Sequence, residues 1–273
     1  MSGIVPSTES FFLFDGALLH ASPEHAWLLE QEDTLHLYDD LGEQAIAVGP
    51  LLLPATPATG KIAQAMATST EPMQFAISRL TGRLSTDRLD RHLRRLRYLE
   101  TDNAQRYYFR YADGRAFEAV WRTLEPEQQA ALLGPIISWE HIGRDGRLHK
   151  RVPPSLRQDQ APAPLPLRLQ PRQWHLALEA GRIGELFDST LHANARPAYQ
   201  GDPEQWYAWT EQTYHWLRRL GIDKPPVRLA ANRVMWQTAG LVYRHTQFEQ
   251  ALIDAQRSDD TSHLLDYGEL RKR

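Results

Sequence analysis

The fold is decided by residues 85–115, which read STDRLDRHLRRLRYLETDNAQRYYFRYADGR. In the first half of this stretch, Leu89 and the leucines four and seven residues later share one face of a helix. In the second half, aromatic residues alternate over 107–111, a period of two that predicts a strand ending in a turn at Asp113 and Gly114. The stretch therefore predicts an amphipathic helix followed by an aromatic strand.

The polar side of that helix is crowded with arginines and also carries two aspartates. These residues are Arg88, Arg91, Arg94, Arg95 and Arg97, with Asp87 and Asp90. The aspartates are spaced to pair with arginines three or four positions away, so a solvated mixed face is favoured over a nucleic-acid surface. His92 lies among these arginines, where a cationic setting disfavours its protonated form. We therefore expect His92 to pack or to form a hydrogen bond, and not to act as a base.

Arg110, Asp113 and Arg115 form a second charged group at the predicted strand end. One interpretation is a buried or half-buried ion pair that fixes the strand to the next helix, because arginine donates bidentately to carboxylates. The alternative is a functional contact site, since perturbed charges gather at such sites too. We favour the structural interpretation.

Composition sets limits on the class of protein. The 273 residues are enough for one large domain or two smaller ones, and no apolar run reaches the roughly 18 residues of a membrane span. The N-terminus has no positively charged segment of a secretory signal, so we expect a cytoplasmic protein without a membrane partner. The absence of cysteine excludes disulfides, thiolate zinc sites and a cysteine nucleophile.

The net charge of -3 hides an acidic block at the start of the chain. Residues 1–60 contain nine acids and neither lysine nor arginine, so the remainder carries 31 basic residues against 25 acidic ones. We expect the acidic block to pack near the arginine-rich helix, where the two charge sets offset each other. If they do not meet, two opposite patches are left for partners.

Strand and helix patterns interleave over the first part of the chain and then give way to helices alone. This order predicts an α+β fold: a mixed α/β lobe with a mixed sheet over 1–152, followed by an all-helical lobe over 172–273. Between them, residues 153–171 hold six of the eighteen prolines, a density that predicts an extended linker and a domain boundary.

The helical lobe carries the candidate partner contacts. Three tryptophans, Trp206, Trp209 and Trp216, share one face of a helix, and we expect them to form the core of the lobe. Tyr207 and Tyr214 lie on a neighbouring face, with Arg218 near the end of the same helix. Tyrosine and arginine are enriched among binding anchors, so we predict that Tyr207, Tyr214 and Arg218 contact a protein partner.

The usual catalytic and cofactor motifs are missing from the sequence. No zinc-protease, nucleophile-elbow, phosphate-loop or dinucleotide-binding pattern occurs. His141 and His149 could meet across a hairpin, but a zinc site needs a third ligand, and no residue at a supporting spacing supplies one. We therefore expect no catalytic residue, no metal and no cofactor.

Several motifs together resemble the type VI secretion effector-chaperone (adaptor) family over about residues 11–142. They are DRHLRRL at 90–96, FRYADGR at 109–115, LEPEQ at 124–128, DGA at 15–17, and the stretch from LYD at 37–39 to GPL at 49–51. The RLGI at 219–222 in the helical tail is similar in a weaker way. The family pattern usually has proline where this chain has Gly114, which bears on the rigidity of that turn and not on the fold.

The resemblance implies a bacterial cytoplasmic adaptor without catalysis of its own. Such a protein binds a toxic effector and helps to load it onto the VgrG spike. The resemblance also marks His92, Arg110, Asp113 and Arg115 as family-signature residues. Two alternatives stay open: a hydrolase that uses scattered histidine and aspartate residues, and a nucleic-acid-binding protein that uses the arginine-rich helix at 85–97. The acidic block and the negative net charge oppose the second alternative.

Overall fold

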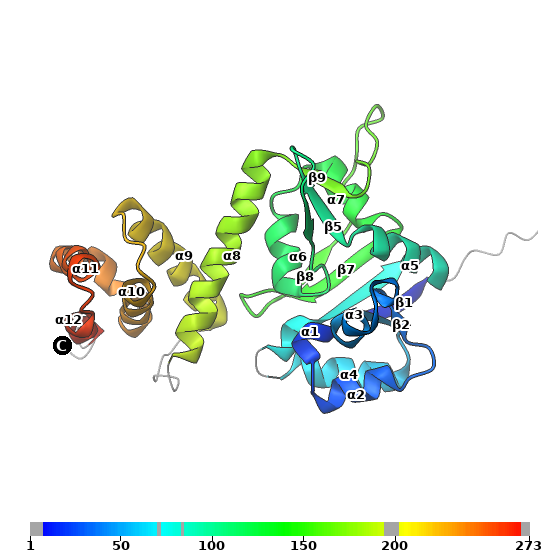
Figure 1. Ribbon diagram of the computed structural model, residues 1–273, viewed down its shortest axis with the longest axis horizontal. Helices are drawn as coiled ribbons and strands as arrows, with labels where there is room; N and C mark the ends of the chain where they lie inside the picture. Colours follow the sequence, from blue (N-terminus) through cyan, green and yellow to red (C-terminus); the bar gives the residue numbers. More distant parts are fainter. Residues whose placement is uncertain (1–7, 70–71, 83–84, 194–201, 269–273) are drawn as a thin grey trace, which may run out of the picture. The chain divides into compact units, whose positions relative to one another are not determined.

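The computed structural model describes residues 8–69, 72–82, 85–193 and 202–268. The predicted α+β class is confirmed, with two sheets and a series of helices. The chain divides into two compact units (Figure 1). The first unit comprises 1–143 and 147–178, and the second comprises 144–146 and 179–273.

A six-stranded sheet forms the centre of the first unit, in the order β2-β3-β1-β4-β7-β8. Its strands are β1 (Glu9–Asp15), β2 (Leu35–His36), β3 (Pro50–Pro54), β4 (Ile77–Gly82), β7 (Ile136–Ile142) and β8 (Leu148–Arg151). Every neighbouring pair in this sheet is antiparallel. This sheet is therefore antiparallel throughout, and the mixed pairing that the sequence predicted occurs in the second sheet.

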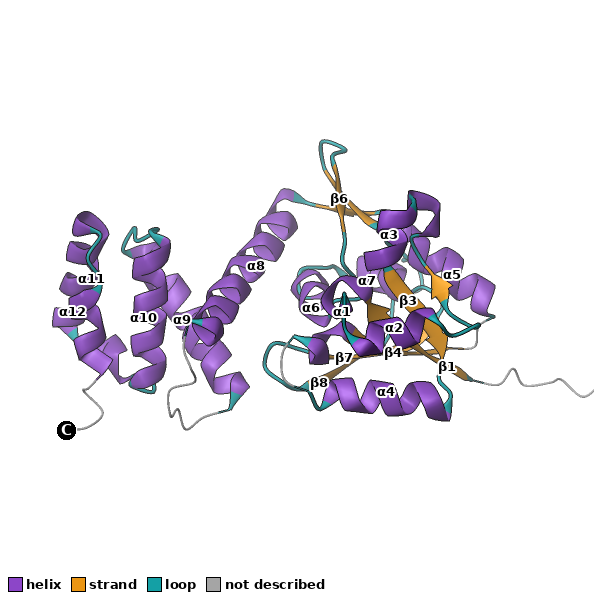
Figure 2. Cartoon of the chain, turned by 60° about the horizontal axis from the view of Figure 1, so that its bottom comes forward, coloured by secondary structure: helices purple, strands orange, loops and turns teal. Residues whose placement is uncertain are grey.

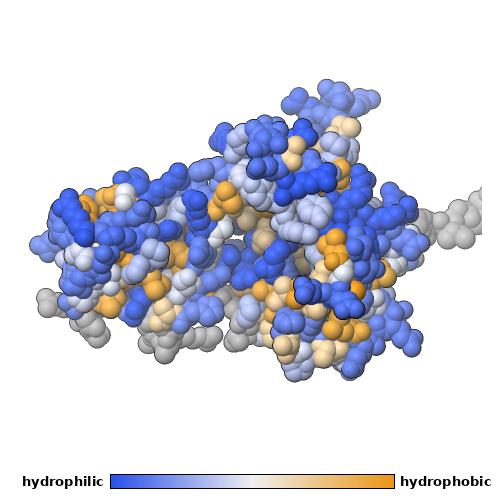
Figure 3. All heavy atoms as spheres, in the orientation of Figure 1, coloured by the Kyte–Doolittle hydropathy of each residue, from blue (hydrophilic) through white to orange (hydrophobic). Residues whose placement is uncertain are grey.

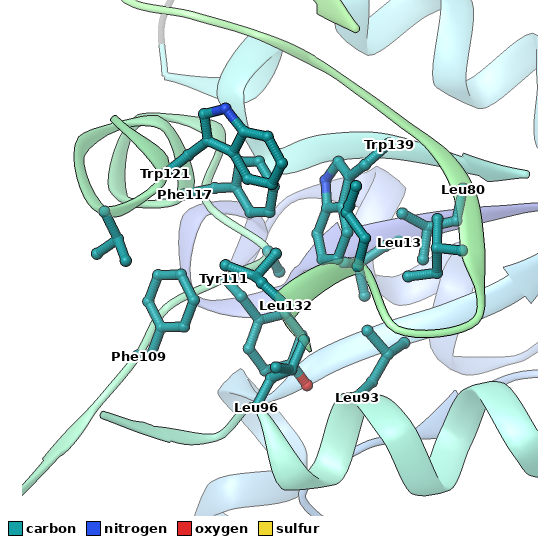
Figure 4. Packing of buried hydrophobic residues seen from close by; sticks show 14 of the residues in the cluster. Leu13, Leu80, Leu93, Leu96, Phe109, Tyr111, Phe117, Trp121, Leu132 and Trp139 are labelled. Atoms are coloured by element: carbon teal, nitrogen blue, oxygen red, sulfur yellow. The ribbon is translucent and has the colours of Figure 1, made fainter. Parts of the chain in front are cut away.

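Alternation along β1 gives this sheet two buried faces. Phe11 and Leu13 join one hydrophobic cluster, whereas Phe14 joins another with Phe12 packed against it. The first cluster also takes in residues from α5, α6 and α7, and Figure 4 shows its central rings. The Phe117 ring stacks on Trp139 at 4.4 Å between centroids.

Helices cover both faces of the six-stranded sheet (Figure 2). Helices α1 (Gly16–Leu19), α2 (Pro23–Leu29) and α4 (Pro57–Ala67) supply the cluster around Phe14, and the short α3 (Glu43–Val48) lies beside α1. Helices α5 (Thr86–Arg95), α6 (Gly114–Trp121) and α7 (Pro126–Leu133) supply the other cluster. The 3-10 turns η1 (Asp39–Leu41) and η2 (Met73–Ala76) also lie in this unit. In the view of Figure 3, exposed apolar residues are most concentrated over α2 and α4.

The stretch at 85–115 gives the predicted helix but only half of the predicted strand. Helix α5 buries Leu89 and Leu93, as the leucine spacing requires. The aromatic strand β6 ends at Tyr108, and the chain then turns into α6, with the Asp113 amide donating to the Arg110 carbonyl at 3.0 Å. The prediction of a strand through Tyr111 is therefore wrong.

A second sheet of three strands follows, in the order β6-β5-β9. Its strands are β5 (Tyr98–Thr101), β6 (Arg106–Tyr108) and β9 (Leu167–Leu169). β5 pairs antiparallel with β6 and parallel with β9, so mixed pairing is confined to this small sheet. β9 arises within the proline-rich segment because Leu167 and Leu169 are buried in the core of the first unit.

The described residues of the second unit form helices joined by turns and loops. It contains α9 (Pro203–Arg219), α10 (Pro225–Gln237), η3 (Leu241–Arg244), α11 (Thr246–Ser258), α12 (Ser262–Leu265) and the latter part of α8 (Pro171–His192). Helix α10 ends at Gln237, and Ala239 and Gly240 after it adopt left-handed φ values of 49° and 81°. No strand occurs after β9 in the part of the chain that the structure describes.

The division into units differs from the boundary that the prolines predict. The segment 153–171 belongs to the first unit, and the division falls after Leu178, inside α8. The physical reason is the pairing of β9 with β5, supported by the Ala163 amide, which donates to the Glu127 carbonyl at 2.9 Å.

Candidate functional site

Asp113 is the centre of a buried ion-pair network at the start of α6. Its carboxylate accepts from Arg115 Nε and Nη2, both at 3.0 Å, and from the backbone amide of Arg115 at 3.0 Å. The same side chain caps the N-terminus of α6, where negative charge is favourable. Asp113 is 4% exposed, so the bidentate pair with Arg115 is largely removed from water.

Arg110 extends this network to the end of β1. Its Nη2 donates to Asp15 Oδ1 at 2.9 Å and lies 3.7 Å from Asp113 Oδ2. Asp15 in turn caps α1 by accepting from the amide of Leu18 at 2.9 Å. Burial raises the pKa of the Asp15 carboxyl, and the charge of Arg110 offsets only part of this effect. The predicted cluster at Arg110, Asp113 and Arg115 therefore exists and also includes Asp15.

The glycine at position 114 is explained by a close approach to β7. A Cβ at Gly114 would lie 2.7 Å from the Ile142 carbonyl oxygen and 3.3 Å from the His141 ring. Proline is favoured at the first position of a helix, but here its ring would meet that backbone. Glycine at this position lets α6 pack directly on β7.

His92 connects α5 to the end of α7. Its Nε2 lies 2.8 Å from the Leu132 carbonyl, and the side chain is buried. A Cβ at Gly134 would lie 2.3 Å from the His92 ring, so glycine leaves room for the imidazole. Burial lowers the pKa of His92, and Arg95 and Arg88 add to that effect against the hydrogen bond to Leu132. The predicted hydrogen-bonding arrangement is present.

The acidic block and the arginine-rich stretch do meet, as the charge pattern predicts. Arg94 Nη1 lies 2.5 Å from Asp39 and 3.3 Å from Asp40. Arg97 is buried and donates to both carboxylate oxygens of Asp40, at 2.9 and 2.7 Å. Two of the arginines are therefore engaged within the fold.

A polar cluster that sequence reasoning missed lies around Glu118 of α6. Glu118 accepts from Arg122 Nε at 2.7 Å and from Arg151 Nη2, while His141 Nε2 approaches its other oxygen at 3.2 Å. Glu118 is 6% exposed and His141 is 1% exposed. These residues come from α6, β7 and β8, so no local pattern in the sequence indicates the cluster.

The cluster holds Glu118 ionised and His141 neutral. Burial alone would raise the pKa of Glu118, but the contacts from His141, Arg151 and Arg122 more than offset it and hold the pKa well below the usual range. Burial lowers the pKa of His141 despite its contact with Glu118. A carboxylate held in this way is a weak base.

His141 and His149 meet across the β7–β8 hairpin, as their spacing allows. They are register partners, and their ring centroids lie 5.6 Å apart. Among the described residues, no group of three or more His, Cys, Asp or Glu is placed to hold a metal ion.

The buried histidines predict a loss of stability in mild acid. His92 and His141 have lowered pKa values in the folded chain, so the unfolded chain binds protons first as the pH falls through about 6.5. We expect the free energy of unfolding to be constant from pH 8 to 7.5 and to fall toward pH 5.5. Each histidine contributes a slope of at most about 1.4 kcal/mol per pH unit. Urea titrations at each pH measure the free energy of unfolding of the wild type and of His92→Gln, and its fall per pH unit should be smaller in the variant. A free energy of unfolding that does not change with pH in the wild type would show that the buried histidines do not cause the loss.

The predicted partner contacts in α9 have different environments. Tyr214 is 6% exposed and packs with Ile183 and Leu186, so the expectation that it is an exposed contact is wrong. It is buried because α8 covers this face of α9. Tyr207 is partly buried against the same cluster, with its ring 5.6 Å from that of Phe187. Arg218 is 54% exposed and pairs with Glu179.

Of the three tryptophans of α9 that the sequence predicts to form the core, only Trp216 is fully part of it, and Trp206 and Trp209 are half-buried. Trp216 is buried, and Trp209 packs against the same cluster. Trp206 stacks on Trp236 at 5.6 Å between centroids.

An exposed tyrosine face, which we define as Tyr98, Glu100, Arg106, Tyr108 and Arg168, lies on one side of the small sheet. Tyr108 is 61% exposed, and its ring lies 4.9 Å from that of Tyr98. Glu100 Oε1 lies 2.8 Å from Arg106 Nε, and Glu100 Oε2 lies 3.6 Å from Arg168 Nη2. Tyrosine and arginine on an open sheet face are typical of protein-binding surfaces. The sequence did not indicate this face, because it forms only when Tyr98 of β5 pairs with Tyr108 of β6.

A comparison with family models matches a segment of the first unit. Residues 10–131, less than half of the chain, match the family model described as "Domain of unknown function (DUF4123)". This family is known in type VI secretion effector adaptors, the class that the motifs at 90–96 and 109–115 resemble. Searches of curated proteins and of solved structures found no match.

The matched range covers the Asp15, Arg110, Asp113 and Arg115 network, and also His92 and most of the acidic block. It excludes the second unit entirely. In the described residues, no helix is both long and apolar enough to cross a membrane.

Proposed function

We propose that this chain is a non-catalytic cytoplasmic adaptor that binds a type VI secretion effector and promotes its loading onto the VgrG spike. The observation that carries the proposal is the family match over 10–131, which coincides with the segment holding the signature network. An adaptor needs two binding surfaces. Each unit offers one: the tyrosine face in the first, and a surface around Tyr207 and Arg218 in the second.

We assign the effector to the second unit and leave the first unit for the spike. Arg218 is exposed at the end of α9, and Tyr207 lies on the same helix partly open to solvent. Tyr214 is buried under this surface, so its ring packs inside the unit and is not exposed to the partner. The matched family segment lies in the first unit, so a contact that such adaptors share belongs there. The spike varies less between adaptors than the effector does, and we therefore assign the shared contact to the spike.

The electrostatics favour the adaptor over the two alternatives. Glu118, in the polar cluster with His141, has a strongly lowered pKa, which makes it unsuited to general-base chemistry in a hydrolase. Arg94 and Arg97 of the arginine-rich stretch face Asp39 and Asp40 and are not left for phosphates.

Co-expression tests this proposal directly. The tagged chain is expressed with the effector encoded beside it and recovered on affinity resin. We expect the effector to co-purify in a stoichiometric complex. A neighbourhood without genes for a spike and an effector, or an effector that does not co-purify, would contradict the proposal.

A further inference from the structure

A pocket of about 320 Å³ opens among α8, α9 and α10, entirely within the second unit. Three arginines line it, one from each helix: Arg182, Arg218 and Arg228. Tyr214, Ile222 and Asp223 also contribute to its wall. We call it the arginine pocket. It brings together residues that lie far apart in the sequence, so no motif indicates it.

The arginines of this pocket differ in how they are engaged. Arg218 pairs with Glu179, whereas no carboxylate lies within ion-pair distance of Arg182 or Arg228 among the residues that the structure describes. The guanidinium carbon of Arg228 lies 5.1 Å from the centroid of the Tyr214 ring. Stacking on an aromatic face orients a guanidinium and leaves its N–H edge open to a planar acceptor.

The acids nearby do not neutralise the pocket. Glu179 is engaged by Arg218, and Asp223 Oδ1 accepts from Gln256 Nε2 at 2.6 Å. The pocket wall therefore holds three guanidinium groups and one carboxylate, and it stays positively charged even when Glu179 beside it is counted. A carboxylate matches this site, because the arginine fork donates two parallel hydrogen bonds to its oxygens.

We infer that the arginine pocket receives the carboxylate of an aspartate or glutamate on the effector. This inference rests on the proposed function, since it specifies the chemistry by which the second unit holds its partner. The wall is half apolar: Ile222 is buried and Tyr214 is 6% exposed, so the stem of an acidic side chain packs while its carboxylate meets the arginines. A charged contact that is shielded from water acts as a binding anchor. The buried Tyr214 ring contributes to it by forming part of the pocket wall beneath Arg228.

Charge reversal at Arg182 tests the inference. Arg182 is exposed on α8 and engages no carboxylate among the described residues, so Arg182→Glu should fold normally. The matched control is Arg257→Glu, which makes the same charge reversal at an exposed residue of α11 that does not line the pocket. Affinity of the full-length chain for the neighbouring effector is measured by calorimetry, with circular dichroism and a thermal melt for each variant. We expect Arg182→Glu to weaken binding at least about tenfold, and Arg257→Glu to change it by less than about twofold.

A charge swap locates the contact on the effector. Acidic residues of the effector are changed to lysine one at a time, and one of them should restore binding to Arg182→Glu. If the wild type binds and Arg182→Glu binds equally well, the inference is wrong while the adaptor proposal stands. If the wild type does not bind the effector, the adaptor proposal fails, and this inference fails with it.

Inorganic phosphate separates a protein carboxylate from a free anion. Phosphate is added to the wild type and to Arg182→Glu, and the melting temperature of each is recorded. We expect no shift specific to the wild type at millimolar phosphate. A rise in the wild type alone, with effector affinity the same in both proteins, would assign the pocket to a free anion and overturn the inference.

Discussion

Replacing Asp113 by alanine should lower the free energy of unfolding by roughly 3 to 5 kcal/mol. The change leaves Arg115, whose side chain is only 13% exposed, without its bidentate acceptor, and it removes the N-cap of α6. It also frees Arg110 to interact with Asp15 alone. Urea denaturation followed by circular dichroism measures the loss.

Two further variants separate the causes of that loss. Asp113→Asn keeps an oxygen that can cap α6 but removes the charge, so it should destabilise less than alanine by about 1 kcal/mol. Asp33→Ala, at an exposed aspartate with no ion pair among those that the structure describes, should change stability by less than about 0.5 kcal/mol. An unchanged melting temperature in Asp113→Ala together with abolished effector binding would make Asp113 a partner contact and not a structural residue.

Glu118→Ala is expected to cost roughly 2 to 4 kcal/mol of folding free energy. Glu118 is buried and compensates Arg151, which is 25% exposed, while it also approaches the fully buried His141. Without this carboxylate, Arg151 loses its charged acceptor at the edge of the core. Thermal and urea unfolding of the purified variant give the value.

Arg122→Ala is the matched control for this cluster. It removes another partner of the same carboxylate, but its side chain is 56% exposed and the pair spans one helical turn. The expected loss is about 0 to 1 kcal/mol. Equal losses in the two variants would show that burial of Glu118 does not govern the cluster.

Local patterns in the sequence were sufficient for helices and for charge pairing. The leucine spacing predicted α5 because one buried face is enough to define an amphipathic helix. The meeting of Asp39 and Asp40 with Arg94 and Arg97 followed from an acidic block that contains no basic residue of its own.

Long-range contacts account for what the sequence did not predict. Proline density suggested a linker, but β9 forms there because Leu167 and Leu169 fill the core beside β5. The Glu118 cluster and the arginine pocket join residues from three separate elements, so neither has a local signature. Helical spacing placed Tyr207 and Tyr214 on one face of α9 without showing that α8 buries it.

The most direct test of the adaptor account is the amount of effector that co-purifies with VgrG from cells that contain or lack this chain. Effector production is kept constant by expressing it from a separate promoter, and total effector is measured in each lysate. The account predicts abundant effector on the spike when the chain is present, and little without it, with the signal restored by complementation. Equal amounts of effector on VgrG in both strains would contradict the account.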